Sequence, residues 1–159
     1  MAKGKAVAGA AKGLFAPIEK WLRTKGLRKG GAHHVFRGEM RRGPGGGVRP
    51  SGWHHRFMGV DPPDRRVTQV TQRDVTGAYR AEVEFNGPNG WVPKHGGSSF
   101  FPDSWTPQEV HRAITEAHAN GSVVPGTNGR RWQGSANGVN IQGSYHPNGR
   151  TWNSGWPVF

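Results

Sequence analysis

The fold is decided by residues 77–121, which read GAYRAEVEFNGPNGWVPKHGGSSFFPDSWTPQEVHRAITEAHANG. Over residues 79–85 apolar side chains alternate with charged ones, which is the pattern of a half-buried strand. The turn-forming residues 86–90 follow, so that residues 91–92 can return as a paired strand. This part of the sequence therefore predicts an antiparallel hairpin.

A helix is predicted over residues 106–121 by signals at both of its ends. Thr106 with Glu109 makes a capping box, and Pro107 occupies the first helical position. Asn120-Gly121 closes the helix. Its buried stripe consists of apolar residues at helical spacing: Val110, Ala113, Ile114 and Ala117.

A three-strand meander is predicted after the helix, over residues 131–135, 139–145 and 151–156. Asn-Gly pairs at 137–138 and 148–149 supply the tight turns between these strands. The chain as a whole therefore predicts an α+β fold, with a helix between two small antiparallel sheets.

Composition narrows the class of protein. The 159 residues suffice for one ordinary domain and an appendage, and only 33% of them are hydrophobic. Seven Trp and seven Phe must therefore supply much of the core. Because there is no Cys, a disulfide scaffold, a thiol nucleophile and a cysteine zinc site are excluded. No apolar run reaches about 18 residues, the length that a membrane-spanning helix needs.

The positive charge lies almost wholly in the first part of the chain. Residues 1–60 hold 13 Lys and Arg against two acidic residues, whereas residues 61–159 hold nine against eight. Such a field attracts nucleic acid or an anionic membrane, although the first thirty residues can equally be a solubilising tail. We divide the chain into a basic arm or linker, residues 1–30, and one domain, residues 31–159. Helical spacing of apolar residues predicts an amphipathic helix at about 13–25.

Histidine supplies the chemistry that the sequence offers. Two pairs, His33-His34 and His54-His55, lie in the basic region. If both pairs are on strands, one imidazole of each faces a common site, because neighbouring strand residues point to opposite faces. Two imidazoles near neutral pKa suit acid–base cleavage of RNA by its own 2′-hydroxyl, and Lys94 in a Gly-flanked loop can stabilise the phosphorane. A metal site is the alternative, but carboxylates are sparse near these pairs.

Several motifs resemble those of EndoU endoribonucleases, and in particular the bacterial toxin branch of that family. The first is a His, apolar residues, a Gly and an acid at 34–39, followed after a loop by a Gly-x-His at 52–54. The others, in chain order, are GAYRAEVE at 77–84, SSFFPDSWT at 98–106, WQG at 132–134 and GVNIQG at 138–143. Together the motifs cover about residues 33–159. The resemblance implies an EndoU or ribonuclease A-like fold.

The resemblance also implies roles for individual residues. His34 matches the family's general acid, His54 its general base, with His55 as the alternative match, and Lys94 its catalytic lysine. The closing family motif is matched by SGWP at 154–157, which assigns Ser154 and Trp156 to nucleotide binding. Trp156 keeps a stacking surface but lacks the phenol hydroxyl of the family's tyrosine.

Three further residues near these positions are assigned to substrate binding. They are His55, Arg56 and His95. The long Gly-Arg loop between the two histidine pairs is expected to touch a substrate or partner.

The function implied is a monomeric toxin that cleaves RNA, with tRNA as one candidate, and leaves a 2′,3′-cyclic phosphate without a cofactor or metal. Such domains are usually the C-terminal ends of secreted bacterial effectors, which act in the cytoplasm of a target cell and are blocked by a cognate immunity protein. The chain's end at Phe159, directly after the last motif, fits that expectation. The alternative function is a non-catalytic basic module that binds nucleic acid.

Overall fold

The computed structural model describes Lys20 and residues 29–159. The first large sheet contains β3 (Arg65–Arg73), β4 (Tyr79–Gly87) and β5 (Gly90–Pro93), and β6 (Ser98–Phe100) also pairs with β4. All of these pairings are antiparallel. The hairpin predicted from the alternating residues is confirmed as β4 and β5.

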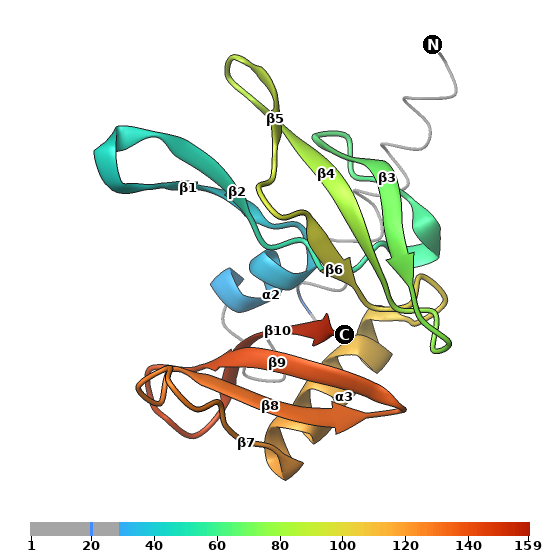
Figure 1. Ribbon diagram of the computed structural model, residues 1–159, viewed down its shortest axis with the longest axis vertical. Coiled ribbons are helices and arrows are strands. Elements are labelled where there is room, and N and C mark those ends of the chain that lie inside the picture. Colours follow the sequence, from blue (N-terminus) through green and yellow to red (C-terminus); the bar gives the residue numbers. More distant parts are fainter. Residues whose placement is uncertain (1–19, 21–28) are drawn as a thin grey trace.

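The second sheet follows the long helix α3 (Pro107–Asn120) and has the strand order β10-β9-β8-β7. Its strands are β7 (Ser122–Val123), β8 (Arg131–Ala136), β9 (Val139–Tyr145) and β10 (Trp152–Val158). The predicted meander is confirmed as β8, β9 and β10, and β7 adds a short edge strand. Figure 1 shows α3 running along one face of this sheet.

Helix α3 begins and packs as its sequence predicts. The Thr106 hydroxyl accepts a hydrogen bond from the backbone N–H of Glu109 at 3.1 Å, which satisfies one of the unpaired donors at the helix start. The predicted apolar stripe is fully buried. The helix can approach β8 closely because Gly134 has no side chain there: a Cβ at Gly134 would lie 2.0 Å from the Ala117 carbonyl oxygen.

The buried side chains form two cores, one for each large sheet. The first core contains Trp53, Tyr79, Phe85 and Phe100. The rings of Trp53 and Phe100 meet edge to face, and their centroids are 5.0 Å apart. The second lies between α3 and strands β8 to β10 and includes Phe101. Consecutive Phe100 and Phe101 thus belong to different cores, and the chain crosses from one sheet to the other at this point.

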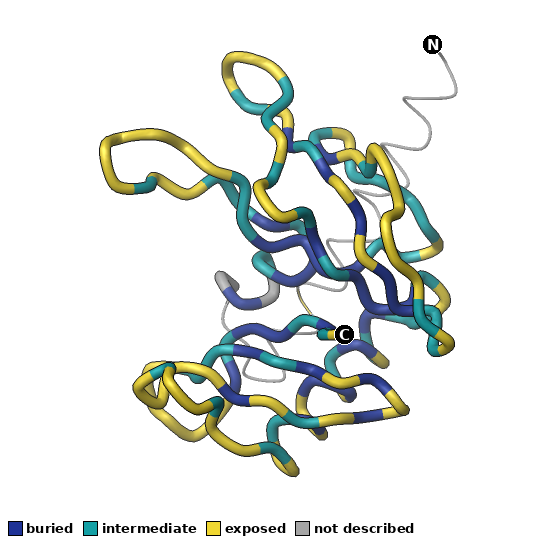
Figure 2. The backbone as a smooth tube through the Cα atoms, viewed as in Figure 1, coloured by how far each residue is buried: buried dark blue, intermediate teal, exposed yellow. Residues whose placement is uncertain are grey.

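The segment between the two histidine pairs differs from the prediction. Residues predicted as a Gly-Arg loop form an antiparallel hairpin of β1 (Glu39–Arg42) and β2 (Val48–Ser51), with a turn at Pro44–Gly46. This hairpin is a third, two-stranded sheet and extends from the rest of the molecule (Figure 1). Figure 2 shows that its outer part is exposed.

Neither histidine pair lies on a strand, which corrects the predicted placement. His33 and His34 lie in the last turn of the helix α2 (Lys29–Phe36), and His54 and His55 lie in irregular chain after β2. The segment KGGAHHVF does not predict a helix, because two glycines precede the histidines and no capping residue marks a helix start. Helix α2 is held by tertiary packing, since Val35 and Phe36 are buried in the second core.

The structure confirms the predicted mixed α+β class. Its strands are mostly antiparallel, and α3 comes between the two large sheets in chain order. Apart from Lys20, the predicted helix at 13–25 lies outside the described residues, as does most of the arm. Within the described part of the chain, no helix is both long enough and apolar enough to cross a membrane.

Candidate active site

A cleft of about 920 Å³ lies where α2, the β1–β2 hairpin and the second sheet meet. It contains the three residues assigned to catalysis: His34, His54 and Lys94. It also contains both residues assigned to nucleotide binding, Ser154 and Trp156. The remaining lining residues are Gly31, His33, Glu39, Arg41, Ser51, Gly52, Arg131, Ser144 and Asn153.

Backbone hydrogen bonds hold the two central histidines together. The Trp53 N–H donates to the His34 carbonyl at 2.7 Å, and the His54 N–H donates to the Val35 carbonyl at 2.6 Å. Gly52 makes this close approach possible because it adopts φ +78°, and a Cβ there would lie 2.3 Å from the His34 carbonyl oxygen. The centroids of the His34 and His54 imidazole rings are consequently 5.6 Å apart.

His54 is buried and is held in one tautomer. Its Nδ1 lies 2.8 Å from the backbone carbonyl of Ser99, which can only accept, so Nδ1 carries the proton and donates. Burial, followed by the positive charges of Lys94 and His34, lowers the pKa of His54 well below 6.5, and the bond to Ser99 opposes this only partly. The neutral ring therefore presents an unprotonated Nε2.

His34 has the opposite kind of partner. Its Nδ1 donates to the Glu39 carboxylate at 2.9 Å, and the same carboxylate oxygen accepts from Arg41 Nε at 2.6 Å. Burial raises the pKa of Glu39, but the hydrogen bonds and charges of His34 and Arg41 outweigh burial, so the net pKa is lowered and Glu39 stays ionised. The Glu39 carboxylate and the C-terminal end of α2 both place negative charge beside the His34 ring.

Lys94 lies beside His54, with its ammonium group fixed by two acceptors. Its Nζ donates to the Gly52 carbonyl at 2.9 Å and to the Ser98 hydroxyl at 2.6 Å. An ammonium has three donors, so a third remains for a ligand in the cleft. Burial lowers the pKa of Lys94 to about 8, with the charge of Glu39 opposing the change.

An aromatic wall is provided by β10. The Trp156 ring lies 5.8 Å from the His54 ring, and the Arg131 guanidinium lies 5.6 Å from the Trp156 ring centre. Next to it, the buried Ser154 hydroxyl shares a 2.7 Å hydrogen bond with Ser144. This wall offers a stacking surface beside the His54 ring and hydroxyl groups on the same strand pair.

Three of the residues assigned to substrate binding do not line this cleft. His55 is buried, hydrogen-bonded through Nε2 to the Trp105 carbonyl at 2.9 Å, and burial lowers its pKa to about 4. Arg56 makes an ion pair with Asp61 at 2.6 Å. His95 is exposed in its loop.

Four ionisable residues of the cleft, Glu39, Arg41, Arg131 and His33, were not assigned a role from the sequence. Glu39 is the acid of the quoted motif, and its spacing from His34 was the available signal. Arg131 and Arg41 gave no signal beyond their charge. His33 was expected to face away from His34 but lines the cleft as well, because adjacent residues on a helix are not on opposite faces. In the described part of the chain, no group of three or more His, Asp or Glu side chains is placed to hold a metal ion.

The fold and the cleft define a mixed α+β protein with paired imidazoles and a lysine in one basic site. A family model described as bacterial EndoU nuclease matches residues 28–158, and the chain belongs to this family. The protein is therefore a nuclease, and the resemblance drawn from the motifs is confirmed. Neither a curated protein nor a solved structure matches the chain.

Proposed function

We propose that the protein is an endoribonuclease toxin domain that cleaves RNA through the substrate's own 2′-hydroxyl. One observation carries this proposal: two imidazoles 5.6 Å apart have partners of opposite character, a neutral carbonyl for His54 and a carboxylate for His34. One ring is thereby suited to remove a proton and the other to deliver one.

In the first half of the reaction, His54 acts as the general base. Its unprotonated Nε2 takes the proton of the 2′-hydroxyl, and the 2′-oxygen attacks the adjacent phosphorus. Because the pKa of His54 lies well below 6.5, the ring is neutral at pH 7 and ready to accept this proton. Its tautomer needs no change, since Ser99 already holds Nδ1–H.

In the second half, His34 acts as the general acid. The bond between phosphorus and the 5′-oxygen breaks, and the leaving oxygen takes a proton from Nε2 of the His34 imidazolium. The products are a 2′,3′-cyclic phosphate and a 5′-hydroxyl. His54 leaves the reaction protonated and His34 neutral, and exchange with water restores both.

Lys94 stabilises the charge that grows on the phosphorane. Its ammonium is a compact point charge with one donor left for a phosphoryl oxygen, and its binding tightens as the oxygen becomes more negative. The Trp156 ring and the Ser154 hydroxyl hold the nucleotide whose 2′-hydroxyl attacks. Stacking on such a ring contributes about 1–3 kcal/mol per base.

The proposal includes a biological setting, supported by membership of the bacterial EndoU nucleases. The domain acts as a monomer in the cytoplasm of a target bacterial cell after delivery as part of a secreted effector. Its substrates are cellular RNAs, with tRNA as one candidate, and a cognate immunity protein blocks it in the producing cell.

Cleavage of total RNA in EDTA tests the activity, followed by analysis of the ends. We expect cleavage without divalent ions, cyclic-phosphate ends, and no cleavage at a site that carries a 2′-deoxy nucleotide. A gel shift without cleavage would indicate the non-catalytic binding module instead. Activity that vanishes in EDTA and returns with manganese or zinc would indicate a metal nuclease.

A further inference from the structure

The two imidazoles give the cleft a direction along the RNA strand. The base contacts the nucleotide on the 5′ side of the scissile bond, and the acid contacts the oxygen of the nucleotide on the 3′ side. His54 lies against Trp156, whereas His34 is bonded to Glu39, the first residue of the β1–β2 hairpin. The hairpin thus borders the side of the cleft on which the proposed acid lies.

One face of the hairpin continues the cleft wall outward. Glu39, Arg41 and Ser51 line the cleft, and in the ladder Glu39 lies opposite Ser51 and Arg41 opposite Arg49. Because alternate strand residues share a face, Arg49 lies on the cleft side together with Arg41. Arg42 and its partner Val48 lie on the other side.

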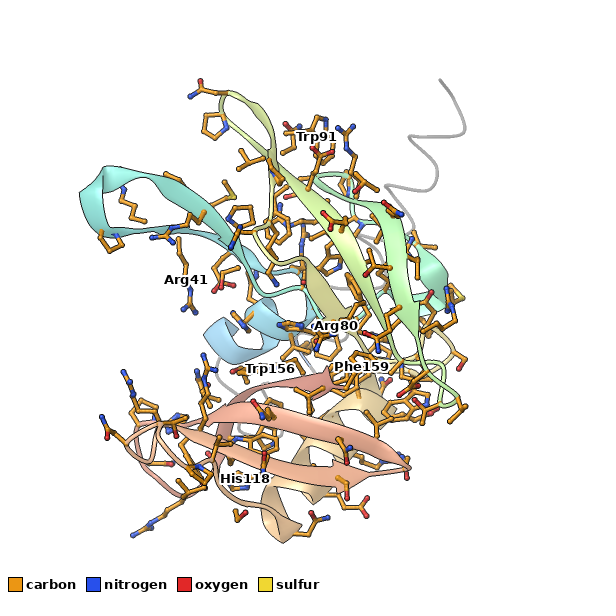
Figure 3. The ribbon with its side chains drawn as sticks, in the orientation of Figure 1. Arg41, Arg80, Trp91, His118, Trp156 and Phe159 are labelled. Atoms are coloured by element: carbon orange, nitrogen blue, oxygen red, sulfur yellow. The ribbon has the colours of Figure 1, made fainter. Side chains whose placement is uncertain are left out.

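This pairing places two positive charges directly across from each other, which destabilises a hairpin unless an anion lies between them. Arg41 is neutralised in part by Glu39, but no acidic side chain in the described part of the chain pairs with Arg49. The Arg49 guanidinium lies over Gly43, where a Cβ would be 2.6 Å from Nη2, and it is exposed. Figure 3 shows Arg41 projecting from the hairpin toward the sheet that carries Trp156.

We propose that Arg41 and Arg49 form a phosphate-binding site for the RNA strand on the 3′ side of the cleavage site. Two residues of a strand span about 7 Å, so the arginine pair lies one step farther along the hairpin than Glu39 and Ser51. A guanidinium fork fits phosphate oxygens in pairs of hydrogen bonds. The nuclease thus favours RNA that continues beyond the break over RNA that ends there. This inference rests on the proposed function and deepens it.

The test compares Arg49→Gln with Arg42→Gln, a matched control that removes the same charge from the other face of the same hairpin. Three RNA substrates share one cleavage site and differ in length: one ends a single nucleotide after the site, one is extended 3′, and one is extended 5′. For wild type we expect the 3′ extension to raise kcat/KM. Arg49→Gln should lose about fivefold of this gain, while Arg42→Gln should keep it. The gain from the 5′ extension should be the same in all three proteins.

A second readout does not depend on cleavage. Binding of RNA with a 2′-deoxy nucleotide at the site is measured against salt, and the salt slope for the 3′-extended strand should become shallower by about 0.7 in Arg49→Gln alone. The assignment is overturned if Arg49→Gln and Arg42→Gln behave alike, or if the loss follows the 5′ extension. In either case normal cleavage by wild type would leave the proposed activity standing. If wild type cleaves none of the RNAs, both proposals fail together.

Discussion

At the scale of single residues, the partner of each imidazole decides what that imidazole can do. His34 and His54 are the same residue type, with ring centroids 5.6 Å apart, yet one donates to a carboxylate and the other to a backbone carbonyl. A carboxylate stabilises the charged ring, and burial against a carbonyl favours the neutral one. This contrast supports the proposed roles of His34 as the acid and His54 as the base.

Lys94→Ala should lower kcat far more than it weakens RNA binding. In the proposed mechanism the interaction with the phosphorane tightens mainly in the transition state, so its loss appears in the rate. Lys94→Arg should restore only part of the rate because a planar fork cannot replace a point charge between Gly52 and Ser98. The measurements are kcat and the Kd for RNA with a 2′-deoxy nucleotide at the site. Equal losses in both quantities would show that Lys94 only binds.

Gly52→Ala should cost stability and activity together. Position 52 combines φ +78° with a Cβ that would lie 2.3 Å from the His34 carbonyl oxygen, so backbone must move at the point that joins the two histidines. Gly45→Ala is the control, with φ +83° and nothing within 4 Å of its Cβ. It should lose only about 1 kcal/mol of unfolding free energy through left-handed strain. Urea unfolding and cleavage rates check both variants, and equal losses would contradict this explanation.

At the scale of elements, the parts with strong local signals could be predicted from the sequence. The hairpin β4–β5, helix α3 and the strands β8 to β10 have alternation, caps or Asn-Gly turns of their own, and the structure contains all of them. Helix α2 lacks such signals, because its sequence KGGAHHVF is helical only when Val35 and Phe36 pack into the second core. The β1–β2 hairpin could not be predicted either, because RRGPGGGVRP has the composition of a loop.

The candidate site was predictable to the extent that motifs mark it. His34, His54, Lys94, Ser154 and Trp156 meet in one cleft, as the family resemblance implied. His55 could not be placed because the direction of a side chain cannot be read in irregular chain, and here Trp53 adopts φ 68° just before the pair.

Thr106→Ala should lower the free energy of unfolding by about 1 kcal/mol because the first turn of α3 loses its side-chain acceptor. Thr106→Ser keeps the hydroxyl and should retain most of the stability. Urea titration of both variants measures the difference. If Ser and Ala are equally destabilising, the hydrogen bond to Glu109 is not the source of the effect.

At the scale of the whole molecule, the buried histidines make stability depend on pH. The pKa of His55 is about 4 in the folded protein and about 6.5 when it is exposed, so the unfolded chain binds the extra proton between these values. Stability should therefore be greatest above pH 6.5 and fall as the pH drops toward 4. His55 alone contributes about 3 kcal/mol to this fall. Burial of His54 acts in the same direction.

His55→Gln should make the unfolding free energy depend less on pH between 7 and 4. Glutamine does not titrate, and its amide can donate to the Trp105 carbonyl in place of Nε2. Urea unfolding at several pH values measures the slope. An unchanged slope would mean that His55 is not the group that takes up the proton.

The most direct measurement of the two-imidazole mechanism uses RNA in which sulfur replaces the 5′-oxygen at the cleavage site. Sulfur leaves as a thiolate and needs no proton, because a thiol has a pKa of about 8.5. On ordinary RNA, His34→Ala and His54→Ala should each lose about 10²–10⁴ in rate. On the sulfur substrate, His34→Ala should recover most of its rate while His54→Ala stays inactive. Recovery of His54→Ala instead, or of neither variant, would contradict the assignment of His34 as acid and His54 as base.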